Sequence, residues 1–219
     1  MKNRLRILGY SILGCLVCIA STQARANTQE WEFRVFLDDR EIGNHNFTVT
    51  DFGDDREVRT EAEFDVKILF FNAYQYRHRN TERWDGRCLD AIESETNANG
   101  DRYSLVGAAE DSAFVLSKAF DDDQAEVTLP DCVTTFAYWD LAFLEQPRLL
   151  NTQTGEYVDI EVELVGEDLL TVRGERVPTY RYRLTGPDLY IELWYSMDLE
   201  WLALESVTDG GRRLRYELI

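Results

Sequence analysis

Short alternating segments separated by turn-forming residues constrain the fold of this chain more than any other feature. Residues 31–37 place their apolar side chains on one face of an extended segment and the charged side chains of Glu32 and Arg34 on the other. Residues 38–40 (Asp-Asp-Arg) then predict a turn, and residues 42–50 predict the returning strand. This pattern is typical of an antiparallel hairpin.

Turn signals recur along the rest of the chain. Asp85-Gly86 and Asn99-Gly100 are the strongest, because both dipeptides tolerate the positive φ angles of a two-residue hairpin loop. Together the signals predict an antiparallel sheet of roughly nine to eleven strands. Because so large a sheet twists and curls, we expect an all-β fold with a curved or closed sheet, a barrel or half-barrel meander. Further turns are expected at residues 53–55, 121–123, 166–168, 173–175, 186–188 and 209–211.

One segment departs from the strand pattern. Asp140 is a capping residue, Leu141 and Leu144 are apolar at helical spacing, and Pro147 terminates the segment. We expect a short helix over residues 140–146. Its apolar side chains would plug one end of a barrel or cover the open face of a curved sheet.

The first 26 residues have the features of a cleavable signal peptide. Basic residues precede an apolar stretch at positions 7–20, and Ala24 and Ala26 are the small residues that a signal peptidase recognises. The apolar stretch of about 14 residues is shorter than the roughly 20 that a membrane-spanning helix needs, so no transmembrane span is expected in the mature chain. We expect residues 27–219 to form a single periplasmic β-rich domain. The alternatives are an uncleaved membrane anchor and a lipoprotein acylated at Cys15 or Cys18.

Charge excludes one large class of partners. The chain holds 41 Asp and Glu residues against 23 Lys and Arg, a net charge of −18, and only three of the basic residues are Lys. An overall negative field opposes approach to nucleic acid or to an anionic membrane. Because 44% of the residues are hydrophobic, the chain can nevertheless fill a core and is not a disordered acidic tail.

Cleavage after residue 26 would leave two cysteines, Cys88 and Cys132, in an oxidising compartment. We expect them to form a disulfide, for which the chain-entropy estimate is roughly 4 kcal/mol. A catalytic or metal-binding cysteine pair is the alternative, but neither residue lies in a C-x-x-C motif. With two isolated His residues, and with residues 121–123 lacking the ligand spacing of an EF-hand, we expect no metal site and no cofactor.

Residues 64–84 contain the main candidate ligand site. If this strand is unbroken, one face begins apolar at Phe64 and becomes aromatic and polar toward Trp84. Such a gradient is typical of a ligand cavity with apolar walls and a polar mouth. The alternative is a core strand whose Tyr hydroxyls are hydrogen-bonded at the rim. The residues predicted to bind a ligand are Phe70, Tyr74, Tyr76, His78 and Trp84.

Arginines occupy the opposite face of the same segment, at positions 77, 79 and 83, and Arg87 follows the turn. They could bind an anion, because the guanidinium fork matches a carboxylate or phosphate. Pairing with acids on neighbouring strands, such as Glu93 and Glu95, is the alternative that we favour in so acidic a chain.

His78 and Glu82 could support acid–base catalysis in a secreted glycan- or ester-acting enzyme. Alternate residues of one strand are separated by roughly 6 to 7 Å, however, so the two side chains are not expected to touch. The sequence also lacks a Gly-x-Ser-x-Gly motif, and no residue is assigned as catalytic.

Several short stretches occur in a fixed order: residues 64–70 (FDVKILF), 74–78 (YQYRH), 82–84 (ERW), 96–100 (TNANG), 137–139 (AYW), 149–155 (LLNTQTG), 193–196 (LWYS) and 211–216 (GRRLRY). Together they resemble an exported bacterial family known as domain of unknown function, family 6134. The resemblance spans nearly the whole chain after the signal peptide. It implies export and a single β-rich domain, and it implies no particular activity, cofactor or catalytic residue. Residues 194–196 followed by 201–207 are more distantly similar to other periplasmic β-rich domains of unknown function.

These observations favour a non-catalytic domain that binds or carries a lipid, another amphipathic small molecule or an envelope component. The enzyme centred on His78 and Glu82 is one alternative hypothesis. A structural or partner-binding envelope protein with a filled interior is the other.

Overall fold

The computed structural model of the protein describes residues 26–68, 71–208 and 210–219. The predicted signal peptide, apart from Ala26, and the predicted site residue Phe70 lie outside the described residues. In the part of the chain that is described, no helix is long and apolar enough to cross a membrane.

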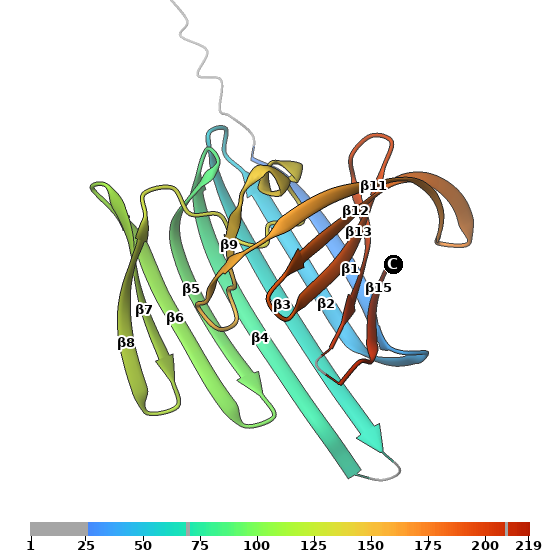
Figure 1. The fold of residues 1–219 in the computed structure, drawn as a ribbon, viewed down its shortest axis with the longest axis horizontal. Coiled ribbons are helices and arrows are strands. Elements are labelled where there is room, and N and C mark those ends of the chain that lie inside the picture. The colour runs from blue at the N-terminus through green and yellow to red at the C-terminus, as the bar shows by residue number, and fades with distance from the viewer. Residues whose placement is uncertain (1–25, 69–70, 209) are drawn as a thin grey trace, which may run out of the picture.

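One curved antiparallel sheet dominates the molecule (Figure 1). The described residues form thirteen of its strands, in the order β11-β12-β13-β14-β15-β1-β2-β3-β4-β5-β6-β7-β8, and two further strands, β9 and β10, pair separately. The strands of the sheet are β1 (Asn27–Leu37), β2 (Arg40–Asp51), β3 (Asp55–Ile68), β4 (Phe71–Asp85), β5 (Cys88–Ala98), β6 (Asp101–Glu110), β7 (Ala113–Phe120), β8 (Asp123–Pro130), β11 (Glu161–Val172), β12 (Glu175–Gly186), β13 (Leu189–Ser196), β14 (Trp201–Val207) and β15 (Arg213–Leu218).

The strand order shows how the chain builds this sheet. It starts in the middle at β1, proceeds strand by strand to one edge at β8, crosses over, and returns from the other edge at β11 until β15 pairs with β1. The all-β prediction is confirmed, and the expected strand number was too low. The sheet is also not closed, because β8 and β11 do not pair with each other.

Most of the turn signals in the sequence lie at hairpin turns of the structure. Asn99 and Gly100 both have positive φ, 58° and 112°, as a two-residue loop between β5 and β6 requires. The turn expected at residues 166–168 was wrong, because Gly166 lies inside β11 at a register shift against β12. A glycine within a strand often marks such a bulge, since the bulge needs a backbone conformation that other residues avoid.

Residues 64–84 do not form one unbroken strand. They divide into β3 and β4, which pair as a hairpin with Phe64 opposite Tyr76 and Val66 opposite Tyr74. The sequence between Ile68 and Phe71 contains no Gly, Pro, Asn or Asp that would have predicted a break between two strands. The two-residue alternation still holds within each strand, so Phe64, Val66 and Tyr76 are buried on the same face of the sheet.

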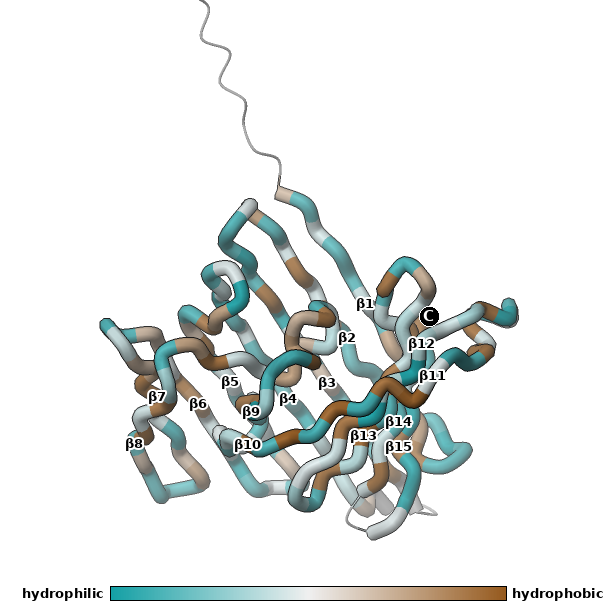
Figure 2. The backbone as a smooth tube through the Cα atoms, turned by 45° about the horizontal axis from the view of Figure 1, so that its top comes forward, coloured by the Kyte–Doolittle hydropathy of each residue, from teal (hydrophilic) through white to brown (hydrophobic). Residues whose placement is uncertain are grey.

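Residues 131–160 cross from β8 to β11 over one face of the sheet, which we call the inner face (Figures 1 and 2). This crossing segment contains the 3-10 helix η1 (Leu141–Glu145) and the strands β9 (Arg148–Leu150) and β10 (Tyr157–Asp159). The predicted short helix is therefore present, and the Asp140 side chain accepts a hydrogen bond from the Ala142 backbone at 3.0 Å. Phe143, Leu149 and Leu150 of the segment are fully buried.

Aromatic packing joins the crossing segment to the sheet. The ring of Trp201 lies 4.4 Å from Phe33, 5.0 Å from Phe47 and 5.2 Å from Tyr138, measured between centroids. These contacts connect β14, β1 and β2 with the crossing segment. The hydrophobic core thus lies between the inner face and the segment that covers it.

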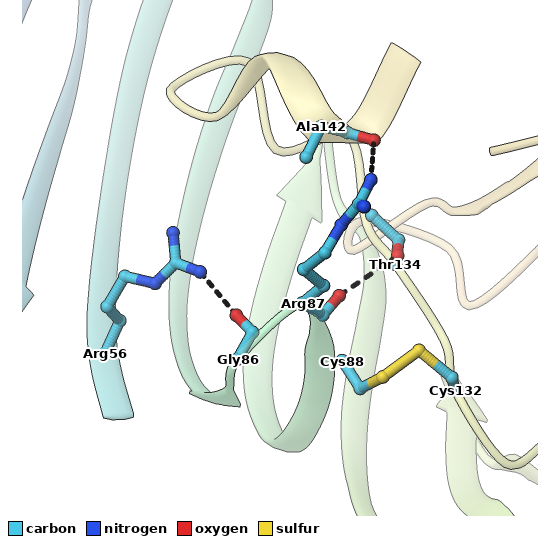
Figure 3. Close-up of a disulfide and its surroundings, with 7 residues drawn as sticks. All are labelled: Arg56, Gly86, Arg87, Cys88, Cys132, Thr134 and Ala142. Atoms are coloured by element: carbon cyan, nitrogen blue, oxygen red, sulfur yellow. Dashed lines mark hydrogen bonds between the residues drawn. A yellow bond between two sulfur atoms is a disulfide. The ribbon is translucent and has the colours of Figure 1, made fainter. Parts of the chain in front are cut away.

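The disulfide between Cys88 and Cys132 holds the start of the crossing segment to β5 (Figure 3), with the two Cα atoms 4.9 Å apart. Beside it, the Leu89 backbone donates a hydrogen bond to Val133 at 2.8 Å. Arg87 donates to the Ala142 carbonyl at 3.3 Å and pairs with Glu145. The predicted cysteine pairing is present, and the surrounding contacts hold the crossing segment in place.

Candidate functional site

A row of polar side chains on the inner face of β4 is the basis of the candidate site. His78, Asn80 and Glu82 alternate along the strand and are 3%, 5% and 3% exposed. His45 on β2 is 8% exposed and lies on the same face, because β3 places Ala62 between it and His78 in register. We call His45, His78, Asn80 and Glu82 the inner cluster.

Three donors surround the Glu82 carboxylate. Asn80 Nδ2 donates to Oε1 at 2.7 Å, and Trp84 Nε1 donates to Oε2 at 2.8 Å. The Thr135 hydroxyl, from the crossing segment, donates to Oε2 at 3.4 Å. Burial raises the pKa of Glu82, while these hydrogen bonds act in the opposite direction. The carboxylate therefore links β4 to the crossing segment.

Both histidines are buried, and each is hydrogen-bonded through its Nδ1 atom. His78 Nδ1 lies 2.9 Å from the Thr96 hydroxyl, and His45 Nδ1 lies 3.2 Å from the Tyr216 hydroxyl. Desolvation lowers the pKa of His78 to about 4 and holds the pKa of His45 well below its usual value. Both imidazoles are therefore neutral near neutral pH.

A cavity of about 200 Å³ lies against this cluster, and all four of its members line it. The other walls come from β13 to β15 and from residues 135–139 and 151–153 of the crossing segment. The Thr152 carbonyl accepts a hydrogen bond from Ser94 on β5 at 2.6 Å, which holds this part of the cover against the sheet. The apolar lining residues include Phe47, Val58, Leu189, Ile191, Leu204 and Leu214.

Two residues of the lining carry buried polar atoms without a hydrogen-bond partner. These atoms are His45 Nε2 and Asn80 Oδ1, and the hydroxyl of nearby Tyr76 is in the same state. Leaving a buried polar group unpaired costs about 1–3 kcal/mol per group. The site therefore contains hydrogen-bonding capacity that the described part of the chain does not use.

The five residues predicted to bind a ligand have different positions. His78 lines the cavity, whereas Trp84 and Tyr76 lie beside it: Trp84 contacts Glu82, and the Tyr76 ring centroid is 6.4 Å from that of His78. Tyr74 is 38% exposed, and Phe70 is outside the described residues. Their role in ligand binding stays a prediction.

Other lining residues were missed. Sequence alternation could have found His45, because it precedes the buried Phe47 by two positions on β2. Tyr216 and Thr135 had no local signal, since they reach the site through β15 and the crossing segment.

The proposed acid–base pair does not form a dyad. His78 bonds to Thr96, whereas Glu82 bonds to Asn80, Trp84 and Thr135. Within the described residues, no group of three or more His, Cys, Asp or Glu side chains is placed to hold a metal ion.

The outer face of β2 to β7 carries a larger open groove of about 750 Å³. Arg77 pairs there with Glu63 at 2.8 Å and with Asp65 at 3.1 Å, and Arg79 lies 3.7 Å from Glu61. The arginines thus pair across strands, with acids of β3 instead of the β5 acids Glu93 and Glu95 that we expected. Because these guanidinium groups already have carboxylate partners, we prefer the inner cavity as the candidate site.

Comparisons with known proteins support the fold. Residues 33–219 match the family described as "Domain of unknown function (DUF6134)". The fold is similar to the crystal structure of a β-barrel-like protein of domain of unknown function DUF1849 from Brucella abortus, with a TM-score of 0.64 and 12% sequence identity. That similarity covers 90% of this chain and 98% of the other. No curated protein matches the sequence.

Proposed function

We propose that this chain, which belongs to the DUF6134 family, is a non-catalytic domain that binds or carries an amphipathic ligand between its sheet and the crossing segment. The observation that carries the proposal is the cavity beside the inner cluster. Its lining combines apolar side chains with His45 and Asn80, each of which has a buried polar atom without a partner among the described residues. A ligand with a polar group and an apolar part matches both features.

The cover supports the same proposal. The crossing segment is held at one end by the disulfide and further along by the hydrogen bond from Ser94 to the Thr152 carbonyl. It therefore shields the polar end of a ligand from water, which strengthens hydrogen bonds inside the site. The predicted signal peptide supports a periplasmic location, which is part of the proposal.

Native mass spectrometry of protein purified from the periplasm without detergent tests the proposal. We expect an adduct whose mass, after organic extraction, is that of a lipid or another amphipathic molecule. A clean apoprotein mass would contradict the proposal and favour a filled-core partner protein.

A matched pair of variants ties the adduct to the cavity. Ser206 lines the cavity, whereas its neighbour Val207 is 47% exposed. Ser206→Phe should remove the adduct by filling the site, and Val207→Phe should leave it. Retention of the adduct in both variants would place the ligand elsewhere.

A further inference from the structure

We infer that the ligand carries an uncharged headgroup with one or more hydroxyl groups that donate hydrogen bonds into the inner cluster. This inference rests on the proposed binding function and specifies the chemical class of the ligand. It follows from the charges around the cavity, from the orientation of Asn80 and from the environment of His45.

The lining excludes an anionic headgroup. No Lys or Arg is among the described residues that line the cavity, and Glu82 contributes a carboxyl group. A buried carboxylate or phosphate without a cationic partner would lose its hydration without compensation. Fatty acids and phospholipids that place their charge in this cavity are therefore poor ligands.

A cationic headgroup is disfavoured for a related reason. Glu82 is the one acid among the described lining residues, and both of its oxygens already accept hydrogen bonds. Both imidazoles of the lining are neutral and offer no charge to a cation. An ammonium group would therefore be desolvated with only an occupied carboxyl group nearby.

Asn80 offers an acceptor to a ligand that donates a hydrogen bond. Its Nδ2 group donates to Glu82, which fixes the orientation of the amide and leaves Oδ1 as the unpartnered atom. An amide oxygen can only accept hydrogen bonds, so its partner must be a donor.

His45 requires less of the ligand, because its Nε2 donates or accepts according to which ring nitrogen carries the proton. A hydroxyl group both donates and accepts, so it suits either atom. Strand β3 separates His45 from Asn80, so two strand spacings of about 4.8 Å each, roughly 10 Å in all, lie between their backbones. One hydroxyl group therefore serves one of the two residues, and a headgroup that serves both needs two hydroxyl groups on well-separated carbons.

The volume of the cavity limits how much of a ligand it can enclose. The cavity of about 200 Å³ corresponds to roughly seven water molecules at about 30 Å³ each. It holds a small headgroup and the first carbons of a chain, so the remainder of a long ligand extends out of the cavity.

The test compares three probes with the same ten-carbon chain: 1-decanol, decanoate and decylammonium. Each is titrated near pH 7 into the delipidated protein, and binding is followed by calorimetry and by tryptophan fluorescence, because Trp139 lines the cavity. We expect 1-decanol to bind roughly tenfold more tightly than either charged probe, since each charged headgroup must be desolvated.

The outcomes separate the two proposals. Tighter or equal binding of decanoate or decylammonium would overturn the headgroup inference and leave the binding function in place. If none of the three probes binds to protein that is free of co-purified ligand, both the headgroup inference and the proposed binding function would be overturned.

A matched pair of variants locates the headgroup. Asn80→Leu should weaken 1-decanol binding by roughly tenfold, because it removes the acceptor. Asn46→Leu, on the outer side of β2, should leave binding unchanged. Asn80 also contacts Glu82, so circular dichroism must show a folded variant, and His45→Phe provides a second removal of an unpartnered atom. Unchanged affinity in both cavity variants would contradict the assignment.

Discussion

Two carboxylates in this molecule each accept a hydrogen bond from a tryptophan indole, and their pKa values shift in opposite directions. Trp84 donates to Glu82 on the inner face, and Trp194 donates to Asp168 on the outer face. Burial raises the pKa of Glu82, whereas hydrogen bonds from the Leu169 backbone and from Trp194 lower the pKa of Asp168. Hydrogen bonding is similar at the two sites, so the degree of burial decides the direction.

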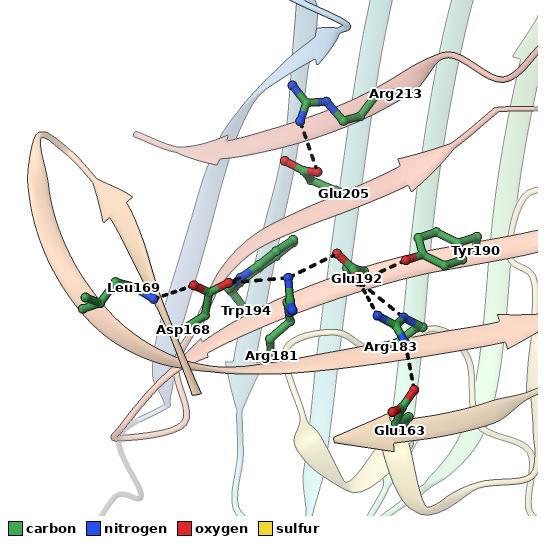
Figure 4. Close-up of polar contacts among 10 residues, drawn as sticks. All are labelled: Glu163, Asp168, Leu169, Arg181, Arg183, Tyr190, Glu192, Trp194, Glu205 and Arg213. Atoms are coloured by element: carbon green, nitrogen blue, oxygen red, sulfur yellow. Dashed lines mark hydrogen bonds and ion pairs between the residues drawn. The ribbon is translucent and has the colours of Figure 1, made fainter. Parts of the chain in front are cut away.

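The neighbours of the two carboxylates extend this contrast. Asp168 belongs to an outer cluster of charged residues on β11 to β13, formed by Glu163, Asp168, Arg181, Arg183 and Glu192 (Figure 4). Arg183 bridges Glu163 at 2.9 Å and Glu192 at 3.2 Å. Arg181 has an unpartnered Nε atom, but its guanidinium group still lies 3.6 Å from Asp168 and 3.9 Å from Glu192.

The difference shows where a binding site can arise. Charges in the outer cluster have opposite charges and water as partners, so a ligand would have little to add. The inner cluster is buried, carries little charge and has unpartnered atoms, so a ligand there would satisfy groups that the described residues leave unsatisfied.

Removing the disulfide, which holds the crossing segment over the inner cluster, should have the largest effect on stability. The Cys88→Ser/Cys132→Ser variant should lose roughly 4 kcal/mol of unfolding free energy, because the unfolded chain is no longer constrained. Urea denaturation measures the loss, and reduction of the wild-type protein is the control. An unchanged midpoint would show that the disulfide does not stabilise the cover of the inner cluster.

Alanine variants of Glu82 and Asp168 compare the inner and outer faces of the sheet directly. Glu82→Ala should cost about 3 kcal/mol, because Asn80, Trp84 and Thr135 lose a buried acceptor. Asp168→Ala should cost about 1 kcal/mol or less, because its side chain is 41% exposed. Equal losses in urea denaturation would break the contrast between the faces.

Stability should fall as the pH is lowered, because the folded protein holds His78 with a pKa of about 4 whereas an unfolded chain has an ordinary value of 6.5. The unfolded state then binds the additional proton, so His78 contributes about 2 kcal/mol less stability at about pH 5 than at about pH 7. His45 acts in the same direction.

Glu82 opposes this trend. Its folded pKa is raised above 4.5, so its contribution to stability increases as the pH falls through the folded pKa. Denaturation of wild type and His78→Gln at several pH values separates the contribution of His78 to stability from that of Glu82. Parallel curves for the two proteins would contradict the role of His78.

The smallest effect should come from the outer cluster. Arg183→Met should reduce stability by about 0.5–1 kcal/mol, because the ion pairs with Glu163 and Glu192 are partly exposed. High salt should shrink this difference between variant and wild type. A loss comparable with that of Glu82→Ala would show that the outer cluster is more than a surface network.

Local patterns predicted the hairpins at Asp85-Gly86 and Asn99-Gly100, the buried face of β1 and the short helix capped by Asp140. They failed to separate β3 from β4, because the sequence there has no turn-forming residues, and they failed where Gly166 formed a bulge. Phe64 and Tyr76 were correctly placed on one face, but as partners across a hairpin instead of residues along one strand.

Local sequence patterns are enough to predict the all-β class, the alternation that buries His78 and Glu82, and the pair of cysteines available for a disulfide. These features depend on neighbours along the chain or on simple counting. The cavity required the tertiary structure, because His45 meets Tyr216 across 171 positions and Glu82 meets Thr135 across 53. The crossing segment and the return of β15 to β1 create these contacts, and no local pattern encodes the register in which distant strands meet.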